Sequence, residues 1–220
     1  GPERRERGAS NMPTLNRRRW LTAAALTPVA GALIARAADV TSTSAVPSPR
    51  ESIQARYLPN VVLRTQDDKE VRFYDDLIKD KIVTINFIYS TCADGTCPLI
   101  TANLVQVQRL LGKRVGRDIF MYSITLNPRH DTPRVLKRYA GAYNVGPGWQ
   151  FLTGPPDDIE FLRRKLRFTD VDPEIDKDPS RHSGNVRYGN EPLMQWAMCQ
   201  GQATPRYIAD SILWVVPKPA

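Results

Sequence analysis

The strongest constraint on the fold is a nearly continuous apolar run that leads directly into a loop with two cysteines and then into a helical pattern. Residues 82–89 read Ile-Val-Thr-Ile-Asn-Phe-Ile-Tyr, which is typical of a central strand covered on both faces. Leucine and valine recur at helical spacing over residues 99–111. Between them, residues 90–98 read Ser-Thr-Cys-Ala-Asp-Gly-Thr-Cys-Pro. We therefore expect Cys92 and Cys97 to lie between a buried strand and the start of a helix.

Strands and helices alternate along the rest of the chain. This order predicts an α/β domain over residues 57–220, with a central, mostly parallel sheet flanked by helices, an N-terminal hairpin and an inserted hairpin near the C-terminus. We expect strand segments at 58–63, 70–73, 119–125, 149–152, 185–188 and 193–199, the last two joined by a turn at Gly189-Asn190, and helices at 132–143, 157–166 and 205–215.

The first 37 residues have the order of parts found in an export signal. Arg17 and Arg18 stand just before an apolar run over 21–34, and Ala-Arg-Ala at 35–37 matches a small-x-small cleavage site. The run is about 14 residues, shorter than the roughly 20 that span a membrane. We therefore expect a twin-arginine signal peptide at 1–37 and a periplasmic protein, or one tethered to the outer face of the inner membrane by an uncleaved leader.

Two further segments are set apart from the predicted domain. Residues 1–11 precede Met12, the first methionine, and are treated as possible non-native sequence. Residues 38–56 contain many Thr, Ser and Pro residues, a composition that predicts a flexible spacer between leader and domain.

The net charge does not indicate a nucleic-acid partner. The whole chain has 31 Lys and Arg against 23 Asp and Glu, a net charge of +8. Seven bases and two acids lie in residues 1–37, so +5 belongs to the leader and +3 to the remainder. A net charge of +3 on residues 38–220 is too small to indicate a DNA- or RNA-binding surface.

The two loop cysteines carry the chemistry. Pro98 suits the first turn of a helix, so Thr96 or Cys97 is predicted to cap it, and the helix dipole should lower the pKa of the Cys97 thiol. Thiolates are nucleophiles and also soft ligands that select Cu(I), zinc or iron–sulfur clusters. Two cysteines with one further histidine favour an open, three-coordinate copper site over a closed zinc site. A structural disulfide between Cys92 and Cys97 is the alternative in an oxidising compartment.

Three ordered motifs resemble the Sco/SenC family. The first is Phe-Ile-Tyr-Ser-Thr-Cys at 87–92, followed by Cys97-Pro98. The second is Leu-Asn-Pro-Arg-His-Asp-Thr-Pro at 126–133, and the third is His182-Ser183 ahead of a strand. Three motifs in the same order are far more specific than any one of them.

The resemblance implies a thioredoxin-like fold and a copper metallochaperone. The implied ligands of Cu(I) or Cu(II) are Cys92, Cys97 and His182. The implied partner is cytochrome c oxidase subunit II, whose binuclear copper site would receive the metal. Other copper chaperones or thiol reductants are further candidate partners.

The sequence departs from the family pattern at three places. Four residues separate the cysteines, where the family usually has three, and Gly95 can absorb the insertion because glycine tolerates positive φ. Asn127 replaces the family's aspartate, so Asp131 alone keeps a carboxylate in that loop and is expected to support the site. Cys199 has no counterpart in the motifs, and we expect it to be buried and dispensable. His130 is expected to be a solvated loop residue.

Two other functions use the same residues. A dithiol on this scaffold could act as a thiol–disulfide oxidoreductase on exported proteins, and a copper or redox sensor could use the same ligands. The motifs favour a non-enzymatic copper chaperone over both. His182 separates the copper chaperone from the oxidoreductase, because copper retention needs the imidazole whereas electron exchange needs only the thiols.

Overall fold

The computed structural model describes residues 47–91, 95–178 and 184–217. The predicted leader and the proposed ligands Cys92 and His182 lie outside these residues. Among the described residues, no helix is both long and apolar enough to cross a membrane.

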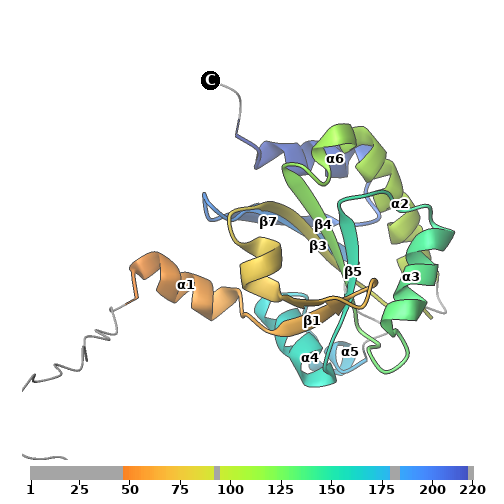
Figure 1. The fold of residues 1–220 in the computed structure, drawn as a ribbon, viewed down its shortest axis with the longest axis horizontal. Coiled ribbons are helices and arrows are strands. Elements are labelled where there is room, and N and C mark those ends of the chain that lie inside the picture. The colour runs from red at the N-terminus through yellow and green to blue at the C-terminus, as the bar shows by residue number, and fades with distance from the viewer. Residues whose placement is uncertain (1–46, 92–94, 179–183, 218–220) are drawn as a thin grey trace, which may run out of the picture. The chain divides into compact units, whose positions relative to one another are not determined.

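A seven-stranded mixed sheet forms the centre of the domain (Figure 1). Its order is β2-β1-β5-β4-β3-β6-β7. Parallel pairing is confined to the three middle strands, β5, β4 and β3, and all other pairs are antiparallel. The strands are β1 Val62–Thr65, β2 Glu70–Arg72, β3 Ile82–Ile88, β4 Ile119–Thr125, β5 Trp149–Thr153, β6 Asn185–Asn190 and β7 Gln195–Gln200.

Helices cover both faces of this sheet. They are α1 Pro49–Tyr57, the π-helix η1 Phe73–Ile78, α2 Thr96–Leu111, the 3-10 helix η2 Gly112–Arg114, α3 Pro133–Ala142, α4 Pro156–Lys165, α5 Pro173–Asp176 and α6 Pro205–Trp214. Figure 1 shows α2, α3 and α6 along one side of the sheet, and η1 and α4 on the other. The α/β fold expected from the alternation of strands and helices is thereby confirmed.

Two hydrophobic cores follow from this layering. One packs residues of α2, α3 and α6 against the sheet, and the other packs η1 and α4 against the opposite face. Strand β3 contributes to both: Val83, Ile85 and Phe87 belong to the second core and Ile88 to the first. Successive side chains of a strand point to opposite faces, so the nearly continuous apolar run 82–88 contributes side chains to both cores.

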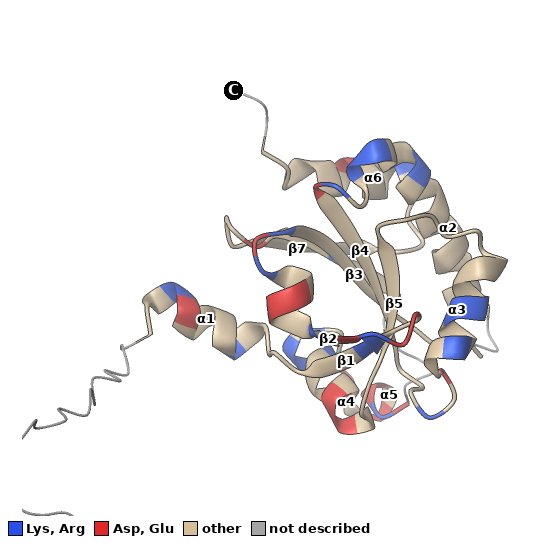
Figure 2. Cartoon of the chain, in the orientation of Figure 1, with Lys and Arg blue, Asp and Glu red and all other residues tan. Residues whose placement is uncertain are grey.

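The helices begin where the local sequence supplies caps. Thr132 and Thr204 accept hydrogen bonds from the backbone N–H groups of Val135 and Tyr207, at the starts of α3 and α6. Helix α4 has acidic residues in its first turn and basic residues in its last, which complements the helix dipole. Figure 2 shows charges of both signs on the domain, with basic residues on α3 and acidic ones on η1 and α4.

Part of the predicted spacer is helical. Residues 49–57 form α1, whereas a flexible segment was expected as far as residue 56. The cause is a capping box: Ser48 Oγ accepts from the Glu51 N–H at 3.2 Å, and the Glu51 carboxylate accepts from the Ser48 N–H at 2.7 Å. Pro49 occupies the first turn, where its missing N–H is harmless.

The predicted turn of the C-terminal hairpin is wrong by a few residues. Gly189 and Asn190 belong to β6, and residues 191–194 make the connection to β7. Gly189 pairs with Trp196, and a Cβ on Gly189 would lie 2.3 Å from the Trp196 ring. The glycine is therefore needed to let the indole lie across the strand. Asn190 donates its side-chain amide to the Val215 carbonyl at 2.9 Å, a tertiary contact that the local pattern does not reveal.

Candidate functional site

The site begins where β3 ends and α2 starts. Gly95, in a left-handed conformation with φ of 77°, is the N-terminal cap residue, and the helix starts at Thr96. This corrects the prediction that Thr96 or Cys97 would be the cap. A residue with a Cβ would be strained at this φ, so the glycine in the longer cysteine spacing sets the entry into α2.

Cys97 is held at the first turn of α2 and is 1% exposed. The Tyr89 N–H, one residue beyond β3, donates to Cys97 Sγ at 3.3 Å. The sulfur also lies at the positive end of the helix. A donated hydrogen bond and a helix N-terminus both favour negative charge on sulfur, which suits a thiolate used as a nucleophile or a soft metal ligand.

A hydrogen-bonded chain links the first turn of α2 to α3. Thr101 Oγ1 donates to the Cys97 carbonyl at 2.9 Å and lies 2.9 Å from the Tyr139 hydroxyl. Burial raises the pKa of Tyr139 well above its usual range, and the nearby Cys97 contributes in the same direction. The Tyr139 hydroxyl is therefore a neutral hydrogen-bonding group near the sulfur and not a second anion.

Asp131 is fully buried and contacts Ser90, which follows β3. Its carboxylate accepts from the Ser90 hydroxyl, from the Ser90 N–H at 3.4 Å, and from the Thr125 hydroxyl at 2.5 Å. His130 Nδ1 is 2.8 Å from the same carboxylate. Asp131, the residue expected to support the site, therefore hydrogen-bonds to Ser90, which leads from β3 toward the cysteines.

Parallel pairing brings these groups together. Strands β3 and β4 are parallel neighbours, and Ile88 pairs with Thr125. The carboxyl ends of the two strands therefore meet at one edge of the sheet, where the loops that follow them face each other. Local patterns do not reveal that Ser90, Thr125 and His130 contact Asp131. The available signal is that Ser90 and Thr125 stand at the ends of two strands and that His130 directly precedes Asp131. His130 is half exposed and contacts Asp131, so it is not simply solvated.

Residue 184 packs against the same turn of α2. A Cβ on Gly184 would lie 2.6 Å from Ile100 Cδ1 and 3.7 Å from Thr96 Cγ2. The Gly184 carbonyl also accepts from the Gly201 N–H at 2.8 Å. The described chain therefore resumes after residue 183 directly beside the helix turn that carries Cys97.

Cys199 takes no part in the described contacts around Cys97 and Asp131. It lies in β7 opposite Val186, is half-buried, and contacts the α2–α3–α6 core. Burial raises the pKa of its thiol to about 11. The prediction of a fully buried residue is therefore corrected to a half-buried one. Within residues 47–91, 95–178 and 184–217, no three His, Cys, Asp or Glu side chains form a group that could hold a metal.

The family assignment rests on a match over most of the domain. A family model described as SCO1/SenC matches residues 58–212. This chain belongs to the SCO1/SenC family. The match spans the strand that precedes the cysteines, the Asp131 loop and the C-terminal hairpin, which are the parts that build the site.

Individual relatives agree with this assignment. The SCO1 protein homolog of Bacillus subtilis is 32% identical over 92 residues, which cover 41% of this chain and 46% of that protein, so the chain spans about half the length of that curated relative. ScoI of Bradyrhizobium japonicum, solved with copper bound, has 24% identity and a TM-score of 0.56, with 70% of this chain and 96% of that chain covered. BsSco, from a study of a disulfide switch, has 24% identity and a TM-score of 0.57, with 70% and 90% covered. These likenesses confirm the thioredoxin-like fold.

Proposed function

We propose that this chain is a copper metallochaperone that binds one copper ion through Cys92, Cys97 and His182. Its cargo would be delivered to the binuclear copper site of cytochrome c oxidase subunit II. Membership of the SCO1/SenC family supports this proposal. The copper-bound ScoI structure and the description of the Sco family as cytochrome c oxidase assembly proteins support it further.

The main support for the proposal is the position of the Cys97 sulfur. Its sulfur accepts the Tyr89 N–H at a helix N-terminus, an environment suited to a thiolate ligand. Gly184 packs on the same helix turn, and two residues of chain reach at most about 7 Å. His182 is two residues from Gly184, so this reach supports His182 as the histidine that binds copper together with Cys97. Two soft sulfurs and one imidazole suit both Cu(I) and Cu(II).

Asp131 acts as a supporting residue and not as a ligand in this proposal. Its oxygens are engaged by Ser90, Thr125 and His130, and hard carboxylate oxygen is a poor match for Cu(I). By anchoring Ser90, it restrains the path of the chain just before the cysteines. Loss of the carboxylate should therefore weaken copper binding indirectly, through the loop.

Copper titration of the full chain under reducing conditions tests the ligand set. Cys92→Ser and Cys97→Ser should abolish tight binding, because the thiolates supply most of the affinity for Cu(I). His182→Ala should retain weaker, mainly Cu(I) binding and lose most Cu(II) retention, as read from absorption and paramagnetic resonance spectra. Cys199→Ser is the matched control and should bind copper like the parent.

Binding should also weaken as the pH falls. All three ligands must lose protons before they coordinate, so affinity should decrease toward and below the ordinary imidazole pKa of about 6.5. If the His182→Ala protein held both copper states as tightly as the parent, the site would be wrong. The two cysteines would then be better explained as a redox pair that acts on exported proteins.

We further propose that the chain works in the periplasm or on the outer face of the inner membrane. The support is the sequence order of paired arginines, apolar run and cleavage pattern in residues 1–37. This location would bring the copper site to the compartment where an exported oxidase domain is assembled.

A further inference from the structure

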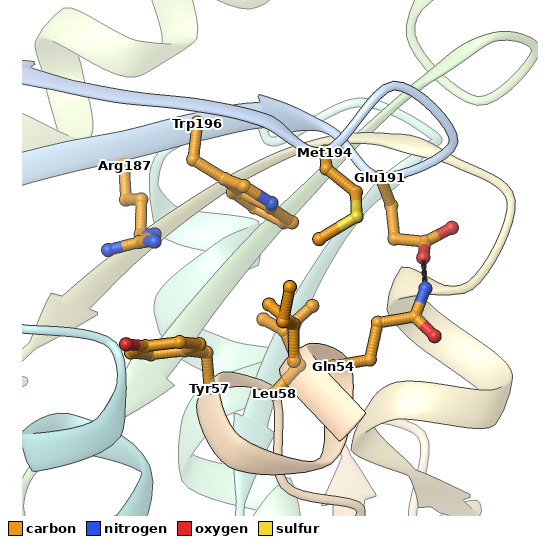
Figure 3. Close-up of a pocket in the computed structure, with 8 residues that line it drawn as sticks. Gln54, Tyr57, Leu58, Arg187, Glu191, Met194 and Trp196 are labelled. Carbon is orange, nitrogen blue, oxygen red and sulfur yellow. Dashed lines mark hydrogen bonds between the residues drawn. The ribbon is translucent and has the colours of Figure 1, made fainter. Parts of the chain in front are cut away.

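A cavity of about 200 Å³ lies between α1 and the β6–β7 hairpin. Figure 3 shows Tyr57 at the end of α1 and Leu58 just after it, facing Met194, Trp196 and Arg187 of the hairpin. Its walls are mainly apolar or aromatic. Pockets for drug-sized ligands usually measure about 300–1,000 Å³, so this cavity suits a smaller molecule, such as one ring with a short side chain.

Arg187 gives this apolar cavity a positive charge. Its Cζ lies 5.2 Å from the centre of the Trp196 ring, and its Nη1 donates to the Leu166 carbonyl at 3.0 Å. Its Nε is buried and has no hydrogen-bond partner among the described residues. No carboxylate pairs with Arg187 in the part of the chain that the structure describes. Burial, together with the positive charge of Arg167, lowers the pKa of Arg187.

The acidic residue in the same cavity is already fully engaged. Glu191 is 1% exposed, and its carboxylate accepts from Arg50 at 3.2 Å, from the Tyr74 hydroxyl at 3.1 Å, from the Asp80 N–H at 2.9 Å and from the Gln54 amide. These contacts fix α1 against the hairpin. Arg50 supplies the positive charge that offsets the Glu191 carboxylate, which leaves Arg187 without a carboxylate partner among the described residues.

We propose that this cavity binds a small organic carboxylate with an apolar body. The carboxylate would accept hydrogen bonds from the Arg187 guanidinium, whose planar fork matches a carboxylate. The apolar body would pack between Trp196 and Leu58. Such a ligand supplies the anion that Arg187 lacks, because an unpaired charge is unfavourable in an apolar site. None of the residues that line this cavity is a proposed copper ligand.

Nuclear magnetic resonance of the full chain can test the proposal with phenylacetate as the probe. The indole N–H resonance of Trp196, assigned with a Trp196→Phe variant, should shift and saturate as phenylacetate is added. The neutral analogue 2-phenylacetamide has the same shape, and it should bind at least ten-fold more weakly because it cannot form the charged pair. Equal affinity for the two probes, or no saturable shift at millimolar concentrations, would overturn the proposal.

Variants then test the role of Arg187. Arg187→Met keeps much of the length of the side chain but removes the charge, and it should abolish the preference for the carboxylate over the amide. Arg206→Met is the matched control, because Arg206 is exposed and pairs with Asp210 on α6, and it should keep the preference. Should Arg187→Met fail to fold, the comparison of the two probes on the parent chain still decides. A carboxylate preference that survives in folded Arg187→Met would assign the anion contact elsewhere and refute the site.

Discussion

The ion pair between Arg163 and Asp176 allows a quantitative prediction about the segment that leads toward His182. Arg163 Nη1 and Nη2 contact the two carboxylate oxygens of Asp176 at 2.5 and 3.0 Å, and the Asp170 N–H also donates to this carboxylate at 2.9 Å. Side-chain exposure is only 5% for Arg163 and 11% for Asp176. The hydrogen bonds from Arg163 are the main cause that lowers the pKa of Asp176 from 3.8 to about 2.

The change to make is Asp176→Asn. The lowered pKa means that ionised Asp176 stabilises the fold, and at about 1.4 kcal/mol for each pH unit the difference corresponds to about 2 kcal/mol at pH 7. This contribution is complete above the unfolded pKa and disappears as the pH falls through the folded pKa. It should therefore still be about 2 kcal/mol at pH 4 and only about 1 kcal/mol at pH 3.

Urea-induced unfolding, followed by tryptophan fluorescence at pH 7, 4 and 3, measures this difference. Glu174→Gln on the same short helix is the matched control, because Glu174 is 77% exposed and its pair with Lys177 is a surface contact. The control should change the free energy of unfolding by less than about 0.5 kcal/mol. An Asp176→Asn protein as stable as the control at pH 7, or a difference that grows between pH 4 and pH 3, would refute the reasoning.

Three further predictions concern other parts of the chain. Burial raises the pKa of the Cys199 thiol from 9.0 to about 11, so its alkylation at pH 8 should be about 100-fold slower than that of an unperturbed thiol. Mass spectrometry of a variant in which both loop cysteines are replaced by serine measures this rate. Thr125→Val should lower the free energy of unfolding by about 2 kcal/mol by removing a hydroxyl donor from buried Asp131, whereas Thr125→Ser should cost less; equal effects in urea unfolding would contradict this contact. Replacing Arg17 and Arg18 by lysine should retain the precursor in the cytoplasm, and export at the normal rate in a fractionation assay would exclude the twin-arginine pathway.

Much of the scaffold could be predicted from local patterns. The run over 82–88 forms β3, the predicted strand over 119–125 is β4, and the helices expected near 132–143 and 205–215 are α3 and α6. These segments have strong periodicity and clear caps, so local sequence decides them. The local patterns did not predict α1, η1 or α5, and they misplaced the first strand and the hairpin turn. The capping box at Ser48 starts α1, and Gly189 lies in β6, where it leaves room for the Trp196 ring.

Local patterns are enough to predict the strand, the two cysteines after it, the helix and the ordered motifs that indicate the SCO1/SenC family, because each depends on neighbouring residues or on their order. Which distant side chains contact each other depends instead on how the elements pack. Parallel pairing of β3 with β4 brings Asp131 under Ser90, and the pairing of β3 with β6 and of β6 with β7 brings Gly184 beside the first turn of α2. The docking of α1 leaves Arg187 beside an apolar cavity. These contacts depend on strand order and packing between residues far apart in the chain, which no local pattern encodes.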